Sequence, residues 1–197
     1  MVSVKSNAGN IRRTNDEYLT PKPLCNAVLN KFPLTTTAKF LDTGAGTGNW
    51  GLSIRGRYKD AVIDGVELRE MSKPDCYTDW YNIDYLSFFP TSKYDVIIGN
   101  PPFRLAEEFI HKSLSLLSDT GILVYVLRLN FLSSISRYHT LWTINPPTYV
   151  EVLSRRPSWY FEDSGSKLTY PDDFAIYYWN KENKTKKTNL EFLMWDY

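Results

Sequence analysis

The stretch FLDTGAGTG, from Phe40 to Gly48, decides the fold of this chain. Its first residues are short and mostly apolar, which predicts a buried strand, and the glycines that follow turn the chain sharply. A helix is expected immediately afterwards, from about Trp50 to Tyr58. A strand that runs through a glycine turn into a helix is typical of α/β proteins, whose ligands bind at the carboxyl ends of the strands.

Segments of strand and helix character alternate on both sides of this stretch. Helices are expected from Pro21 to Phe32 and from Leu105 to Leu117. Further strands are expected at residues 61–67, just before Asp84, and at 94–98, 122–127, 149–153 and 174–179. This alternation predicts a doubly wound α/β fold with a mostly parallel sheet. Only a loop separates the last two strands, so one of them is free to run antiparallel.

Composition narrows the class of protein. The 197 residues suffice for one hydrophobic core, and 43% apolar with 23% charged residues is ordinary for a globular protein. No apolar run reaches the roughly 20 residues of a membrane span, and the first residues lack the apolar core of a secretory signal. Cys25 and Cys76 are too few for a disulfide framework and form no zinc-type pair. We therefore expect a cytoplasmic protein of a bacterium, an archaeon or a virus-infected cell, without metal or membrane partner.

Charge is unevenly distributed although the net charge is only +1. Residues 1–60 carry nine Lys and Arg against four Asp and Glu, residues 61–120 carry five against ten, and the rest carry nine against eight. The basic first third is compatible with a surface that faces phosphate groups, and equally with ordinary solvated charge.

The glycine loop and two acids predict a cofactor site. The loop spacing is GxGxG, whereas loops that cradle a dinucleotide pyrophosphate have GxGxxG. This favours S-adenosyl-L-methionine, which carries no phosphate and needs a tight turn more than an anion cradle. Glu67, 19 residues after Gly48, ends the next strand, where a carboxylate can accept hydrogen bonds from ribose hydroxyls. Asp84 follows a third strand and could accept from an adenine amino group. Each feature alone is common; their order on successive strands carries the prediction.

The tetrapeptide Asn100-Pro101-Pro102-Phe103 follows the clearest buried strand. Its prolines fix φ and remove two backbone donors, which leaves a rigid loop. The Asn100 side-chain oxygen and the Pro101 carbonyl can accept both N–H groups of an exocyclic amine and leave its lone pair directed at a methyl donor. No strong base is needed, because the proton can leave after the nitrogen has attacked. Phe103 offers a flat face for a planar target.

A second NPP sequence provides an internal comparison. Asn145-Pro146-Pro147 precedes an expected strand instead of ending one, and Thr148 follows it where the first motif has an aromatic residue. We interpret it as a plain loop, because Asn-Pro pairs commonly start turns. The first motif could also be such a turn with a core phenylalanine; its place at the carboxyl end of a buried strand favours a functional role.

With both motifs, the chain resembles the N6-adenine-specific DNA methyltransferases, including small phage-type members, over roughly residues 17–180. Thr20-Pro21 is similar to the segment beside the methionine end of their cofactor, FLDTGAGTG to their glycine motif, and NPPF to their catalytic tetrapeptide. The resemblance implies the class I methyltransferase fold: Rossmann-like and doubly wound, with a mostly parallel seven-stranded sheet, a late antiparallel strand and helices on both faces. Residues 1–16 would be a flexible segment, and 17–197 a single catalytic domain.

The resemblance also implies roles for individual residues. Catalysis falls to the NPPF residues Asn100, Pro101, Pro102 and Phe103. Substrate contacts fall to Phe103, Arg156 and Trp159, the last two in a late Arg-Pro-Ser-Trp region; a core role for Trp159 is an equal alternative. The residues implied in binding S-adenosyl-L-methionine are Thr20, Pro21, Asp42, Thr43, Gly44, Ala45, Gly46, Gly48, Glu67, Leu68, Asp84, Tyr85 and Asn100.

The implied activity is methyl transfer to adenine N6 in DNA, on a base turned out of its stack. Sequence-specific relatives carry a sizeable target-recognition region, for which this chain offers only the loop between Arg155 and Asp173, so we expect little sequence specificity. Adenine in tRNA or ribosomal RNA and protein glutamine are alternative substrates, although the glutamine enzymes usually end their motif in tyrosine. A noncatalytic nucleic-acid-binding subunit is a further alternative. The sequence leaves open whether the protein forms a homodimer or works with a partner subunit.

Overall fold

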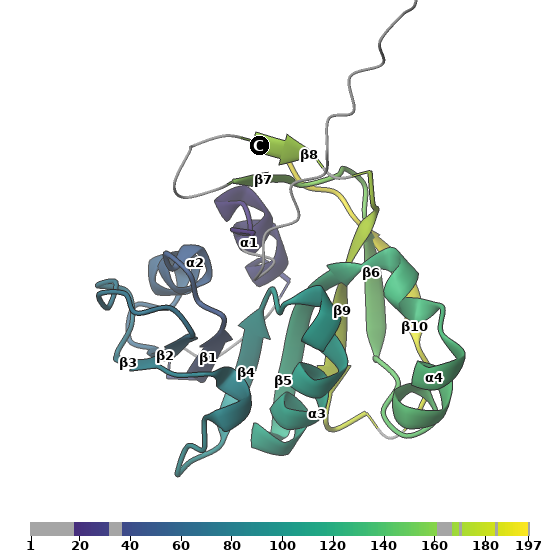
Figure 1. Cartoon of the computed structure of the whole chain (residues 1–197), viewed down its shortest axis with the longest axis horizontal. Coiled ribbons are helices and arrows are strands. Elements are labelled where there is room, and N and C mark those ends of the chain that lie inside the picture. The colour runs from purple at the N-terminus through teal and green to yellow at the C-terminus, as the bar shows by residue number, and fades with distance from the viewer. Residues whose placement is uncertain (1–17, 32–36, 161–166, 170, 184, 197) are drawn as a thin grey trace, which may run out of the picture.

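The computed structural model describes residues 18–31, 37–160, 167–169, 171–183 and 185–196. The expected flexible segment at residues 1–16 lies outside this part of the chain. Within it, eight strands form one sheet in the order β10-β6-β9-β5-β4-β1-β2-β3, with β3 at one edge and β10 at the other (Figure 1). The strands are β1 (Lys39–Thr43), β2 (Val62–Glu67), β3 (Asp79–Asn82), β4 (Tyr94–Gly99), β5 (Leu117–Arg128), β6 (Tyr149–Leu153), β9 (Phe174–Asn180) and β10 (Asn189–Leu193).

Strand directions match the expected doubly wound sheet, but the strand number does not. β9 runs antiparallel to both β5 and β6, and every other neighbouring pair in the sheet is parallel. The sheet has eight strands instead of seven because β10 adds to the edge beside β6. The sequence predicts a polar, basic turn or a short hairpin at residues 181–189 and no strand after it. β10 is exposed at four of its five positions, so it lacks the buried pattern that identifies a central strand.

Helices cover both faces of the sheet because neighbouring residues of each strand point to opposite sides. Phe40 of β1 packs in a core beneath α1 (Lys22–Leu29) and α2 (Asn49–Arg57). Leu41, the next residue, packs in the core beneath α3 (Ala106–Leu116). Short helical segments complete the chain, namely η1 (Tyr85–Ser87), η2 (Phe103–Leu105), η3 (Leu129–Leu132), α4 (Ile135–Arg137) and η4 (Tyr138–Trp142).

The loop after β6 contains a small separate sheet. β7 (Ser158–Tyr160) pairs antiparallel with β8 (Lys167–Thr169), and the pair lies beyond the carboxyl ends of the parallel strands, close to α1 (Figure 1). In the described residues, no helix has both the length and the apolar character that crossing a bilayer requires. The same part of the chain contains no cluster of three or more potential metal-binding side chains.

Candidate cofactor and methyl-acceptor site

Strand register brings the sequence motifs to one place. In the sheet, Thr43 at the end of β1 is paired with Val66 of β2 on one side and with Gly99 of β4 on the other. The glycine loop, Glu67 and Asn100 therefore all begin at the same edge. A Cβ at Gly99 would lie 2.7 Å from the Thr43 carbonyl oxygen, so glycine allows β4 to approach β1 closely just before Asn100.

The glycine loop has the tight turn that its spacing predicts. Gly44, Gly46 and Gly48 have φ of 74°, 53° and 89°, the left-handed region that glycine adopts most easily. The backbone N–H of Gly44 donates to the Val66 carbonyl at 2.9 Å. A Cβ at Gly44 would meet no protein atom within 4 Å. The loop is thus held against β2 while its outer side stays open.

Glu67 joins the glycine loop directly. The Gly46 N–H donates to Glu67 Oε2 at 2.8 Å, and the Arg69 backbone N–H donates to Oε1 at 3.0 Å. The Arg69 guanidinium also binds Oε1 at 2.9 Å. A carboxylate has about four acceptor positions, so Glu67 keeps capacity for ligand hydroxyls while its orientation is fixed.

Asp42 is a buried acid at the end of β1. Its Oδ2 accepts a 2.6 Å hydrogen bond from the Tyr77 hydroxyl, and its Oδ1 is buried without a partner among the described residues. Burial, with a smaller contribution from the nearby Glu67 charge, raises the pKa of Asp42 to about 7. An unpartnered buried carboxylate oxygen is costly unless a ligand donates to it.

The segment before α1 lies beside the start of α2 and Asn100. The Asn49 side-chain amide donates to the Thr20 carbonyl at 2.9 Å, which attaches the segment to the start of α2. Thr20 is 3% exposed, and its hydroxyl oxygen has no partner in the described residues. Pro21 directly precedes α1.

Asn100 has a fixed amide orientation. Its Nδ2 donates to the Tyr18 carbonyl at 2.9 Å, and since a carbonyl can only accept, the nitrogen must face Tyr18. Oδ1 therefore points the other way, buried and without a partner in the described residues. The Pro101 carbonyl likewise receives no hydrogen bond from the described part of the chain. Two acceptors thus stand free on one rigid loop.

Phe103 belongs to an aromatic cluster beside Asn100. Its ring is nearly parallel to that of Tyr18, at 16° and 6.2 Å between centroids, and lies 5.7 Å from Phe174. The Arg128 guanidinium lies over the Phe103 ring, 4.6 Å from its centroid. Trp159 is fully buried against Tyr18 and Phe174, so its indole presents no surface to a substrate in this structure.

Other expected site residues lie farther from the loop or face elsewhere. Asp84 does not end a strand: it is exposed and caps η1, accepting from the Leu86 N–H at 2.9 Å. The Tyr85 hydroxyl bonds to Ser113 of α3 at 2.7 Å, beneath the opposite face of the sheet. Leu68 is 62% exposed beside Glu67.

Three further expected residues form contacts with neighbouring residues. The Thr43 hydroxyl donates to the Tyr125 hydroxyl at 3.0 Å in the core, so only its backbone faces the loop. Arg156 forms a 2.9 Å ion pair with Asp173. Ala45 is buried in the glycine loop, where its N–H donates to the Val66 carbonyl.

Sequence reasoning missed the residues that orient the site. Tyr18 fixes Asn100 through its carbonyl, Tyr77 holds Asp42, and Arg128 covers Phe103. Tyr77 reaches Asp42 over Gly51, where a Cβ would meet its ring at 2.7 Å. A backbone carbonyl leaves no signal in a sequence, and the other two residues belong to no motif.

The match to a family model decides the classification. Residues 25–134, more than half of the chain, match the methyltransferase small domain. The chain belongs to the methyltransferase small domain family. These residues include the second part of α1, the glycine loop, Glu67 and the NPPF tetrapeptide.

Individual relatives match part of this chain. A type II methyltransferase of Paramecium bursaria Chlorella virus XZ-6E is 26% identical over 140 residues, 59% of this chain and 37% of the relative. A release factor glutamine methyltransferase of Shewanella oneidensis is 32% identical over 113 residues, 50% of this chain and 39% of the relative. The chain thus covers about two fifths of the length of these relatives.

Solved structures show the same fold. A Listeria monocytogenes protein described as a class I S-adenosylmethionine-dependent methyltransferase superposes with a TM-score of 0.64 at 14% identity, over 89% of this chain and 65% of that one. The fold is therefore the class I methyltransferase fold. The family match makes S-adenosyl-L-methionine the cofactor.

The residues present fit this cofactor. Buried oxygens of Thr20 and Asp42 lie beside the glycine loop, and neither has a partner in the described residues. The two charges of the cofactor's methionine end are an ammonium and a carboxylate, and an unpartnered Asp42 oxygen suits the ammonium. Glu67 suits ribose hydroxyls, and the open side of Gly44 leaves room for close approach.

Proposed function

We propose that this chain methylates the exocyclic N6 of adenine in DNA, acting on a base turned out of its stack. One observation carries the proposal: Asn100 Oδ1 is a buried acceptor without a partner in the described residues, aimed away from the Tyr18 carbonyl that fixes its amide. A buried acceptor of this kind suits a ligand that brings an N–H.

The chain's own groups would act by positioning. Asn100 and the Pro101 carbonyl accept the two N–H groups of the amine, which leaves the nitrogen lone pair free. S-adenosyl-L-methionine, held by the glycine loop, Asp42 and Glu67, would supply the methyl group, and the methylated nitrogen would lose its proton to water. Placement of the two reactants accounts for most of the expected rate, since no general base is required first.

Phe103 favours a planar acceptor. A purine ring can stack on phenylalanine, and the aromatic residues around Phe103 stabilise its orientation. Since the Arg128 guanidinium covers one face of this ring, a base that stacks on that face must displace it. Arg156 would then contact the substrate at the edge of the acceptor site. The buried Trp159 would support the aromatic cluster around Phe103 without touching the substrate.

Protein glutamine is the second candidate substrate, favoured by the match to a release factor glutamine methyltransferase. Its side-chain amide also offers two N–H donors to Asn100 and Pro101. It offers no planar ring system for Phe103, which is why we rank adenine first. The segment between Arg155 and Asp173, part of which lies outside the described residues, would supply the base preference.

The substrate is tested by incubating the purified protein with radiolabelled S-adenosyl-L-methionine and one of five acceptors. These are duplex DNA, single-stranded DNA, total tRNA, ribosomal RNA and a glutamine-containing peptide. Label in DNA that digests to N6-methyldeoxyadenosine is the expected result. Label confined to RNA or to the peptide would keep the chemistry and replace the substrate, and no transfer to any acceptor would favour a noncatalytic role or a missing partner.

A further inference from the structure

A cationic pocket lies next to the NPPF loop. It has a volume of about 190 Å³, and its lining is Phe103, Arg104, Ala106, Leu127, Arg128, Asn130, Phe131 and Arg137. The lining includes three arginines and no acidic residue. From this we infer that the pocket binds a backbone phosphate of the nucleic acid beside the target nucleotide; this inference rests on the function proposed above.

The Arg137 guanidinium is fixed in position and keeps N–H donors for an anion. Its Nε donates to the Phe131 carbonyl at 2.8 Å and one Nη donates to the Ser133 carbonyl at 3.4 Å, while its guanidinium lies 4.3 Å from the centre of the Phe131 ring. A guanidinium has five N–H donors, so most remain available. Within the described residues Arg137 forms no ion pair, and its positive charge is therefore not neutralised.

The other two arginines differ in their surroundings. Arg128 stacks on Phe103 and forms a 3.2 Å ion pair with Asp172, so its charge is partly compensated. Arg104 is exposed at the rim and, in the described part of the chain, contacts no carboxylate. Among the described residues, Asp172 is the carboxylate paired with these three guanidiniums, so the described part of the pocket carries a net positive charge.

Size and position favour a phosphodiester. The pocket volume of about 190 Å³ leaves room for a phosphate group. Guanidinium forks bind phosphate oxygens in pairs. Since Arg128 touches the ring on which a base is proposed to stack, an anion here would be close to the target nucleotide. Phosphate contacts of this kind fix the position of the strand without reading its sequence, in agreement with the little sequence specificity expected.

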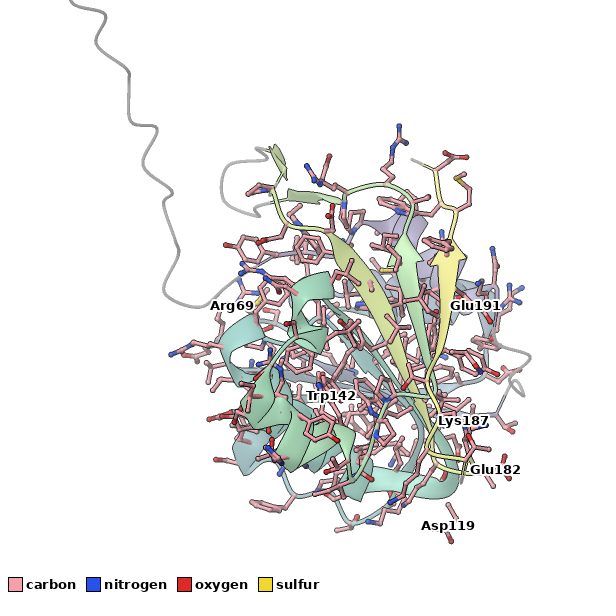
Figure 2. The ribbon with its side chains drawn as sticks, turned by 90° about the vertical axis from the view of Figure 1, so that its right-hand side faces the viewer. Arg69, Asp119, Trp142, Glu182, Lys187 and Glu191 are labelled. Atoms are coloured by element: carbon pink, nitrogen blue, oxygen red, sulfur yellow. The ribbon has the colours of Figure 1, made fainter. Side chains whose placement is uncertain are left out.

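The test measures binding, not turnover, of a fluorescent single-stranded DNA oligonucleotide that contains one adenine. Fluorescence anisotropy compares the wild type with Arg137→Gln, Arg104→Gln and the control Lys187→Gln at several salt concentrations. Lys187 has the same charge but lies in the turn before β10, at the opposite end of the sheet from the NPPF loop (Figure 2). Arg104→Gln is included as a variant that should fold normally, because the Arg104 side chain makes no hydrogen bond to other described residues.

We expect Arg137→Gln to weaken binding about tenfold, and each arginine variant to lower the slope of log affinity against log salt by about 0.7, the value for one phosphate contact on a single strand. Lys187→Gln should stay within about twofold of the wild type. An oligonucleotide with one neutral methylphosphonate linkage beside the adenine should bind the wild type more weakly, and this loss of affinity should be smaller for Arg137→Gln than for the wild type.

Opposite results overturn the inference. If the two arginine variants match Lys187→Gln, or if the neutral linkage and Arg137→Gln weaken binding additively, the pocket binds no phosphate. If the arginine variants lose affinity only for an acidic glutamine-containing peptide, the pocket serves a protein substrate. If the wild type binds neither DNA nor RNA, the proposed nucleic-acid function fails before the pocket is tested, and the two failures are thereby distinguished.

Discussion

At the scale of single residues, the site is defined by polar atoms that the protein itself leaves unsatisfied. Thr20, Asp42 and Asn100 each have a buried oxygen without a partner in the described residues. Leaving such an atom unpaired costs roughly 1–3 kcal/mol, so the fold accepts a stability cost where a ligand is to bind. The sequence predicted all three as site residues, yet only the coordinates show which atom of each is free.

Asp42 leads to a pH prediction. With its pKa raised to about 7, the folded protein keeps a proton on Asp42 from about pH 4 to 7, whereas the unfolded chain has released it. The folded state binds more protons in that window, so this group's contribution to stability is full below pH 4 and is lost as the pH rises to 7. Asp42→Asn removes the dependence and preserves an acceptor for Tyr77.

We therefore expect Asp42→Asn to be more stable than the wild type at pH 8, with a difference that shrinks by on the order of 2 kcal/mol on going to pH 5. Urea unfolding of both proteins at each pH measures it. A difference that does not change with pH would show that Asp42 titrates normally. The variant should also bind S-adenosyl-L-methionine more weakly at pH 8, because it lacks the carboxylate.

At the scale of elements, the sequence identified the parts that have strong local patterns. The sequence predicted the central strands and three helices, at residues 22–29, 49–57 and 106–116. It did so because the spacing of apolar residues identifies these elements and glycines indicate the turns between them. β10 was missed because four of its five residues are exposed at a sheet edge. The third strand lies just before Asp84, as expected, but it ends at Asn82 and not at Asp84, because Asp84 caps the next turn.

The glycine loop gives an element-scale prediction. Gly44 has φ of 74° and open space where a Cβ would go, so Gly44→Ala should cost about 1–2 kcal/mol of stability through backbone strain alone. Its methyl group would project from the open side of the loop and lower affinity for S-adenosylhomocysteine at least about tenfold, as measured by calorimetry.

The matched control is Gly56→Ala, inside α2, where an added Cβ also meets nothing but φ is not positive. It should leave cofactor affinity unchanged and raise stability by about 0.5–1 kcal/mol. Equal affinities for the wild type and Gly44→Ala would mean that the cofactor does not approach this side of the loop.

At the scale of the whole molecule, function depends on residues that the fold gathers from distant parts of the sequence. The cationic pocket proposed to bind phosphate takes Arg104 from the NPPF turn, Arg128 from the end of β5 and Arg137 from α4. The distribution of charge along the sequence indicated the basic first third instead, because it does not show which distant residues come together in the fold. The cofactor site, by contrast, was predictable, because parallel strands carry their carboxyl ends to one edge of the sheet.

The most direct test of the central claim compares methyl transfer to DNA by the wild type, Asn100→Ala and Asn145→Ala, with cofactor affinity measured on the same preparations. Asn145 begins the second NPP sequence, and its side chain is exposed. The account predicts that Asn100→Ala loses transfer by about 100-fold or more while it still binds S-adenosyl-L-methionine, and that Asn145→Ala keeps both. Undiminished transfer by Asn100→Ala, with N6-methyldeoxyadenosine still formed, would contradict the role of the NPPF loop and with it the proposed mechanism.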